Sequence, residues 1–144
     1  MLKLIILLTT FLAIGFINAD AQDTWQILVN KKLIKKGNVG EEGAAFIKAR
    51  TLKSKDCIKI KYKSENEESN WQRTFYINTV EDKVIKRVNM PKQSGSVCIK
   101  GLALKQLQKN KQPFIIYTTS LPNDPAEAAT VRVRRIMLCK IEWN

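Results

Sequence analysis

The sequence predicts an all-β fold, a mostly antiparallel β-sandwich of seven to nine strands. Short runs of strand-forming residues recur along the chain, several with alternating polar and apolar side chains, and turn-like polar segments separate them. The regular alternation of strands and helices that marks a parallel α/β sheet does not occur in the pattern. Helix is expected only as one short helix around residues 102–110 and a helical turn around residues 125–129.

The first 21 residues are expected to be a signal peptide. Lys3 gives a positive start, residues 4–17 form an apolar run, and Ala19-Asp20-Ala21 fits the small-x-small pattern before a cleavage site. A membrane anchor is the alternative, but the run is short for a span of about 20 residues. We therefore predict cleavage before Gln22 and a protein exported to the periplasm or beyond. One β-sandwich domain without a transmembrane segment is expected over residues 22–144.

The first expected strands follow this leader. Residues 25–29 are an apolar run of strand formers, and residues 30–32 resemble a turn. Residues 33–36 are expected to form the strand that returns after this turn. Residues 37–43 have the composition of a loop, and residues 44–49 are the next candidate strand.

The clearest local signal is a strict alternation in residues 57–63. Three apolar side chains share one face and three lysines share the other: Ile58, Ile60 and Tyr62 against Lys59, Lys61 and Lys63. Residues 71–78 alternate as well, although Arg73 interrupts their apolar face. Because a polar, turn-like segment connects these two runs, we expect an antiparallel hairpin.

The second half continues with a turn at residues 81–83, a short strand around residues 84–88 and a brief one at residues 97–100. Leu104 and Leu107 lie three apart among good helix formers, which predicts the short helix, and a buried strand follows at residues 114–119. In residues 120–130, Asp124, Pro125 and Glu127 form a capping-box pattern that predicts the helical turn.

The closing stretch, residues 129–144, is expected to be one long strand. Apolar residues occupy both of its faces in the second half, which indicates a central strand rather than an edge strand. Arg132, Arg134 and Arg135 lie in the first half, where paired donors could grip phosphate, sulfate or carboxylate. Alternatively, Arg135 pairs with a carboxylate such as Asp124 or Glu127, and the cost of burying an unpaired charge favours this interpretation.

Cysteines occur at positions 57, 98 and 139, equally spaced by 41 residues. An exported protein can form a disulfide, but three thiols allow three pairs, and the spacing does not select one of them. All three could also be small buried side chains.

The positive net charge of the chain indicates which classes of partner it could bind. The net charge of +12 is unchanged by loss of the leader, which holds one lysine and one aspartate. Such a surface favours anionic polysaccharide, lipid headgroups or another envelope protein, although it also serves solubility alone. The candidate contacts for an anionic ligand are six cations: Lys59, Lys61, Lys63, Arg132, Arg134 and Arg135. Nucleic acid is disfavoured because no binding module is recognisable.

Little in the sequence indicates catalysis. The chain has no histidine, which removes the usual general base and metal ligand, and the cysteines lack CxxC spacing. No catalytic, cofactor-binding or metal-binding residue is therefore predicted, and no cofactor is expected. A pair of carboxylates could still process a glycan, so an enzyme remains an alternative.

Residues 115–143, IIYTTSLPNDPAEAATVRVRRIMLCKIEW, resemble a segment of small exported bacterial proteins of unknown function. In that segment a strand, an SLPxDPxxAA turn and a VRVRRxxLC strand follow one another. The resemblance covers about a fifth of the chain. It implies export and an all-β domain, and it implies no activity.

These observations favour a non-enzymatic binding or structural domain of the bacterial envelope. The alternatives are a carboxylate-dependent glycan-processing enzyme and an inhibitor or immunity-type interaction module.

Overall fold

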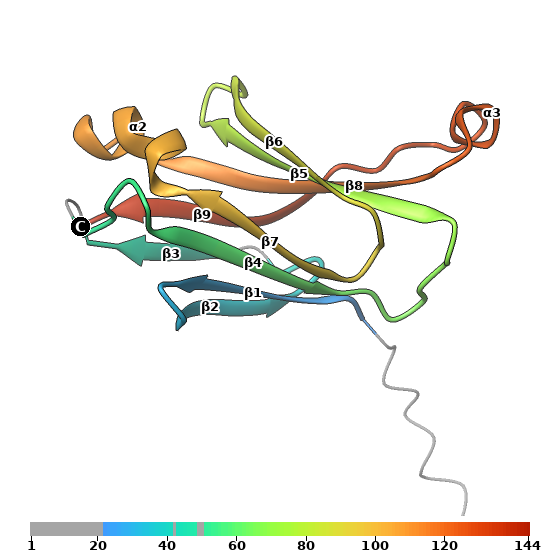
Figure 1. Ribbon diagram of the computed structural model, residues 1–144, viewed down its shortest axis with the longest axis horizontal. Coiled ribbons are helices and arrows are strands. Elements are labelled where there is room, and N and C mark those ends of the chain that lie inside the picture. Colours follow the sequence, from blue (N-terminus) through green and yellow to red (C-terminus); the bar gives the residue numbers. More distant parts are fainter. Residues whose placement is uncertain (1–21, 42, 49–50) are drawn as a thin grey trace, which may run out of the picture.

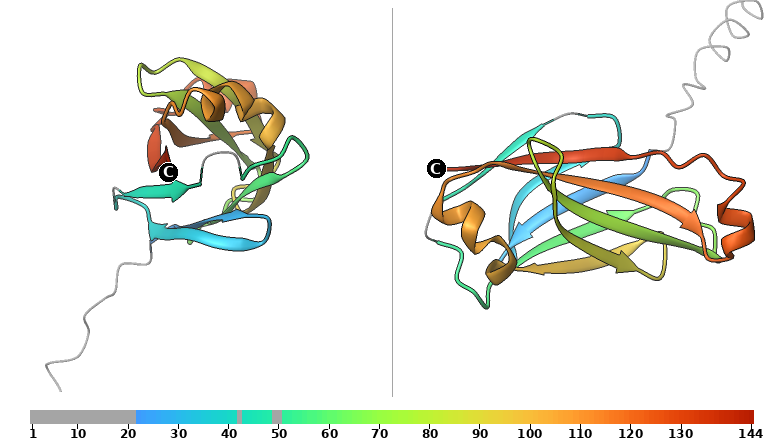
Figure 2. Two further views of the ribbon diagram at one scale, coloured as in Figure 1. Left: turned by 90° about the vertical axis from the view of Figure 1, so that its left-hand side faces the viewer. Right: turned by 90° about the horizontal axis from the view of Figure 1, so that it is seen from above.

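The computed structural model describes residues 22–41, 43–48 and 51–144, so the expected leader lies outside the described residues. Two sheets pack face to face, which confirms the predicted sandwich (Figures 1 and 2). The four-stranded sheet has the order β2 (Lys32–Asn38), β1 (Thr24–Val29), β4 (Cys57–Lys63), β7 (Gly95–Lys100). The five-stranded sheet has the order β3 (Ala44–Ile47), β9 (Ile136–Trp143), β8 (Phe114–Pro122), β5 (Trp71–Thr79), β6 (Val84–Met90).

The strand pairs are antiparallel except for β3 and β9, which run parallel. Part of the connectivity has the strand order of immunoglobulin-type sandwiches, although β2, at the sheet edge beside β1, has no counterpart in that order. If β1, β4 and β7 are lettered A, B and E, the row β9-β8-β5-β6 corresponds to G-F-C-C′. Such connectivity describes the architecture and carries no function by itself.

The predicted hairpin between residues 57–63 and 71–78 is wrong, because β4 and β5 belong to different sheets. Ile60 of β4 pairs with Ile27 and Val97, whereas β5 pairs with β6 and β8. Residues 64–70 therefore cross from one sheet to the other. The two alternating runs meet through their side chains instead, and the rings of Tyr62 and Phe75 lie 6.3 Å apart across the core.

The core lies between the two inward faces. Ile27, Ile58 and Ile60 of the four-stranded sheet oppose Phe75 and Phe114 of the five-stranded sheet, and all are fully buried. Each such side chain stabilises the fold by about 1.5–3 kcal/mol relative to an exposed position. The alternation read from the sequence correctly predicted the inward faces of β4 and β5.

The hairpin between β1 and β2 was correctly predicted at residues 30–32. Asn30 and Lys31 have φ values of 48° and 70°. Two consecutive positive φ values are typical of a type I′ turn, whose twist matches that of the strands. Further along β2, the backbone at Gly37 lies against the Trp25 ring, and a Cβ there would be 2.6 Å from Trp25 Cζ2.

The helical segments lie where they were expected. A 3₁₀ turn, η1 (Gly101–Leu104), leads into α2 (Lys105–Lys109), and Leu104 and Leu107 anchor this segment in the core. The helical turn is α3 (Pro125–Ala128). In the described residues, no helix is both long enough and apolar enough to span a bilayer.

The capping box that the sequence predicted at α3 is half formed. Asp124 caps the helix by accepting a hydrogen bond of 3.1 Å from Ala126 N. Glu127 does not close the box, since its Oε2 accepts from Asn70 Nδ2 at 3.5 Å.

The closing strand is shorter than the sequence predicted. β9 begins at Ile136, and residues 131–135 lead from α3 into it without strand structure. Ile136 is paired with Thr118, whereas Val133 is 50% exposed. The prediction of a central strand is confirmed, because β9 lies between β3 and β8.

Candidate anion-binding surface

The outward face of the four-stranded sheet collects lysines from three strands. Lys59, Lys61 and Lys63 of β4 point to solvent, as their alternation predicted. Strand pairing adds Lys36 of β2 and Lys100 of β7 to the same face. We call these five exposed residues the lysine face: Lys36, Lys59, Lys61, Lys63 and Lys100.

The strand register fixes the spacing of the lysine face. Residues two apart in a strand lie about 6.8 Å apart, so Lys59, Lys61 and Lys63 form a row of regularly spaced ammonium groups along β4. Across the strands, Gln26 of β1 lies between Lys36 and Lys61. Positive charge on the lysine face therefore extends along β4 and also across β1 to β2.

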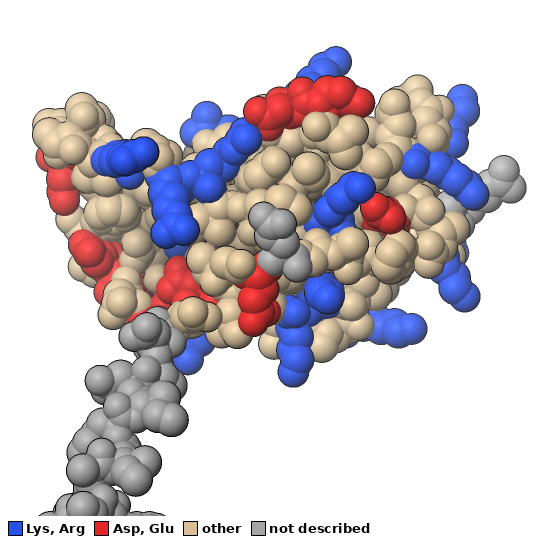
Figure 3. Space-filling view, turned by 180° about the vertical axis from the view of Figure 1, so that it is seen from behind, with Lys and Arg blue, Asp and Glu red and all other residues tan. Residues whose placement is uncertain are grey.

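One acidic side chain, Glu41 after the end of β2, lines a depression of this face together with Lys36, and its carboxylate accepts hydrogen bonds from Asn38. The four strands β1, β2, β4 and β7 contain no aspartate or glutamate. Among the described residues, ion pairs form at Arg73, Arg135 and Lys140, and none includes a lysine of the lysine face. The side of the molecule seen from behind, in contrast, carries acidic and basic side chains near one another (Figure 3).

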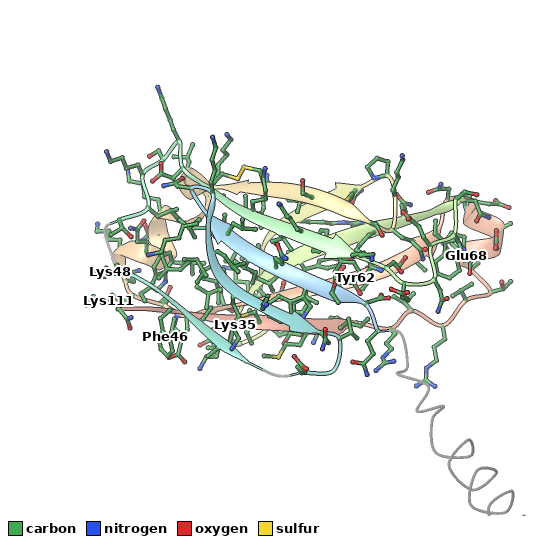
Figure 4. All side chains as sticks on the ribbon, turned by 90° about the horizontal axis from the view of Figure 1, so that it is seen from below. Lys35, Phe46, Lys48, Tyr62, Glu68 and Lys111 are labelled. Atoms are coloured by element: carbon green, nitrogen blue, oxygen red, sulfur yellow. A yellow bond between two sulfur atoms is a disulfide. The ribbon has the colours of Figure 1, made fainter. Side chains whose placement is uncertain are left out.

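The surface of this sheet is slightly hollowed on both sides of β1. A depression of about 520 Å³ is lined by Lys61 and Lys63, and another of about 460 Å³ is lined by Lys36. Thr24 and Gln26 line both. Figure 4 views the molecule from the side of β1, β2 and β4, with Tyr62 near one end of β4. Hydroxyl and amide groups in the hollows can add hydrogen bonds to the charge attraction.

The arginines before β9 do not join the lysine face. Arg132 and Arg134 are exposed in the segment that leads into β9 of the other sheet. Arg135 Nη1 donates to Asp82 at 2.8 Å and its guanidinium stacks 4.3 Å from the Tyr117 ring centre. The interpretation that Arg135 pairs with a carboxylate is confirmed, but the expected partners, Asp124 and Glu127, were wrong.

Asp82 is held by two donors. Hydrogen bonds from Asn78 Nδ2, at 2.9 Å, and from Arg135 lower the pKa of the Asp82 carboxyl, and the Asn78 bond has the larger effect. Arg135 is therefore part of a structural clamp on the β5–β6 turn. Only Arg132 and Arg134 of the predicted arginine cluster remain available to a ligand.

A second lysine cluster, which the sequence pattern did not predict, lies at the α2 end of the sandwich. Lys53 of the β3–β4 loop and three lysines of the α2 segment line a depression of about 530 Å³: Lys105, Lys109 and Lys111. The loop is pinned to η1, because Gly101 N donates to Asp56 O at 2.9 Å and Leu102 N donates to Ser54 O at 3.2 Å. Lys111 lies at the end of the molecule opposite Glu68 (Figure 4).

A buried polar cluster fills the other end of the core. Arg73, only 3% exposed, donates from Nε to Gln93 O at 2.9 Å and from Nη1 to Thr118 Oγ1 at 3.2 Å. Its guanidinium lies 3.7 Å from the Tyr62 ring centre and 3.9 Å from Asp23 Oδ2. Burial lowers the pKa of Arg73, and neighbouring Tyr62 and Asp23 oppose this shift. Its donors serve interior partners, so we assign Arg73 a structural role.

Neither potential metal ligands nor similarity to known proteins identifies a further functional site. No group of three potential ligands among Asp, Glu and Cys side chains gathers in the described part of the chain. Comparison with protein-family models, curated proteins and solved structures finds no match to this chain.

Proposed function

We propose that this protein is an exported, non-enzymatic binding domain of the bacterial envelope, and that its lysine face binds an anionic polysaccharide. One observation carries the proposal. The outward side of a whole sheet presents five lysines, and its strands contribute no acidic side chain to neutralise them. A surface of unpaired charge attracts polyanions and accelerates their encounter.

An extended polymer suits this geometry better than a small anion. Lysine ammonium groups are flexible point charges, each of which contributes little by itself at an exposed site. A chain with repeating carboxylate or sulfate groups can contact Lys59, Lys61 and Lys63 together. The binding then depends on several weak contacts formed at once.

Lipid headgroups share this charge chemistry, but Leu33 alone is too small an apolar area on this face to anchor the protein in a membrane. Gln26 and Thr24 separate the lysines, and Leu33 at 46% is the most exposed large apolar side chain of the four strands. Stable membrane anchoring requires buried apolar area in addition to charge. We therefore prefer a polysaccharide.

The glycan-processing alternative has weaker support. Glu67 and Glu68 line one surface depression, but they are consecutive in the chain and both exposed. Acid and base catalysis of glycoside hydrolysis needs carboxylates on either side of the bond, about 5–10 Å apart. This pair does not provide such an arrangement, so we propose binding rather than hydrolysis.

The test compares two variants that lose the same number of charges. Lys59→Gln/Lys61→Gln/Lys63→Gln removes charge from the lysine face, and Lys48→Gln/Lys83→Gln/Lys86→Gln removes it from exposed positions elsewhere. Both proteins are eluted from immobilised heparin with a salt gradient. We expect the first variant to elute at clearly lower salt than the second. Equal shifts would show that only net charge matters, and unchanged elution of the first would reject the proposal.

A further inference from the structure

The single disulfide among the described residues lies on the lysine face. Cys57 and Cys98 link the neighbouring strands β4 and β7, with their Cα atoms 5.6 Å apart. Cys57 is half-buried and Cys98 is exposed. A thiol in solution can therefore approach the Cys98 sulfur without unfolding of the sandwich.

Each half-cystine has a lysine directly across the strand pair. Cys57 is opposite Lys100, and Cys98 is opposite Lys59. Opposed residues of antiparallel strands have Cβ atoms about 4.5–5.5 Å apart on the same face. Two lysine side chains therefore leave the sheet next to the disulfide, and neither ammonium group is engaged in an ion pair within the described chain.

This environment favours thiol–disulfide exchange. The attacking group and the leaving group are both thiolates, and nearby cations stabilise negative charge on sulfur. The lysine face also concentrates anionic reagents near the bond. Because β4 is paired along its length with β1 as well as β7, the sheet remains assembled when the bond opens.

We propose that the Cys57–Cys98 disulfide is an exchange site for small anionic thiols. The incoming thiolate attacks Cys98 Sγ, a new S–S bond forms, and the Cys57–Cys98 bond breaks. Cys57 leaves as a thiolate beside Lys100, and Cys98 carries the thiol as a mixed disulfide. A second thiolate can attack the sulfur of the bound thiol, which releases the oxidised thiol dimer and leaves Cys98 as a thiolate beside Lys59.

Exchange changes the charge of the lysine face. Each thiolate, and each carboxylate of a bound thiol, cancels part of the positive charge of the neighbouring lysines. The proposal uses the same lysines as the proposed function, but it does not require polysaccharide binding. The proposed polysaccharide binding and the proposed thiol exchange can therefore be rejected independently, the first by heparin elution and the second by exchange rates.

Cys139 provides an internal control. It is fully buried, and burial raises the pKa of its thiol to about 11. The buried, protonated thiol is expected to be inert in the folded protein. Reaction at Cys139 would report unfolding rather than exchange at the surface.

The test uses three thiols of different charge: glutathione (anionic), 2-mercaptoethanol (neutral) and cysteamine (cationic). The folded, oxidised protein is exposed to equal thiolate concentrations, quenched with acid, and the mixed disulfide at Cys98 is measured by peptide mass spectrometry. We expect glutathione to react about tenfold faster than cysteamine at an ionic strength of about 10 mM. At about 1 M salt, where the Debye length is about 3 Å, the difference should disappear.

Matched variants test whether the preference for glutathione depends on the two lysines beside the disulfide. Lys59→Gln/Lys100→Gln should remove most of the preference for glutathione, whereas Lys83→Gln/Lys86→Gln, at the β5–β6 hairpin of the other sheet, should retain it. The proposal would be overturned if Cys98 reacted only under unfolding conditions or if Cys139 reacted as fast as Cys98. It would also be overturned if the ratio of the glutathione rate to the cysteamine rate were the same in both variants.

Discussion

Arg73 offers the sharpest test of how the interior is held together. We consider the substitution Arg73→Met, which keeps a long aliphatic side chain in the core and removes the guanidinium. The lost contacts are the hydrogen bonds to Gln93 O and Thr118 Oγ1 and the stacking on Tyr62. Gln93 O then lacks a buried donor.

The magnitude follows from these contacts. Each hydrogen bond contributes about 1 kcal/mol, and the cation–π contact contributes about 1 kcal/mol in a desolvated site. The ion pair with Asp23 contributes less, because its atoms are 3.9 Å apart and Asp23 is 26% exposed. Asp23 also retains the Tyr62 hydroxyl at 2.7 Å and Glu65 N at 2.9 Å as donors. We expect a loss of about 3 kcal/mol, which lowers the melting temperature by about 10 °C.

The assay is urea unfolding followed by circular dichroism and tryptophan fluorescence. Arg87→Met is the matched control, because Arg87 is exposed on β6 and lies 5.7 Å from the Tyr76 ring centre. It should change the free energy of unfolding by less than about 0.5 kcal/mol. If Arg73→Met proves as stable as the parent protein, the desolvation of the guanidinium outweighs its contacts and Arg73 does not stabilise the core.

Three further predictions concern other parts of the sandwich. The variant Cys57→Ser/Cys98→Ser should unfold with a free energy lower by about 4 kcal/mol, because the disulfide closes a separation of 41 residues; equal urea midpoints would contradict this. The Asp82 carboxyl should titrate below its ordinary range by NMR, and Arg135→Gln should raise its pKa only in part, since the Asn78 bond remains. Because the folded pKa of Asp82 is lowered, the stabilisation that this carboxylate provides is present above its unfolded pKa and is lost as the pH falls through its folded pKa. An unshifted titration of Asp82 would show that the hydrogen bonds from Asn78 and Arg135 do not form in solution. Gly37→Ala should destabilise the protein by about 1–3 kcal/mol, because its Cβ would meet the Trp25 ring. Gly43→Ala is the control and should be less destabilising, because its Cβ would meet only the flexible Lys35 side chain.

Local patterns determined much of the fold class. A period of two in residues 57–63 depends only on backbone geometry, so it correctly placed Lys59, Lys61 and Lys63 on the outward side. Asp124 followed by Pro125 likewise predicted the start of α3 from neighbouring residues alone. The absence of histidine and the net charge of +12 are properties of composition, and they narrow the available chemistry whatever the fold.

The tertiary structure decided every feature that joins distant segments. The sequence could not show that β4 pairs with β1 and β7 instead of β5, that Cys57 pairs with Cys98, or that Arg135 meets Asp82. It also could not show that Lys36 and Lys100 belong to the same face as the lysines of β4. The physical reason is that alternation fixes which side of a strand is buried, whereas the choice of neighbouring strand depends on how each connection crosses between the two sheets.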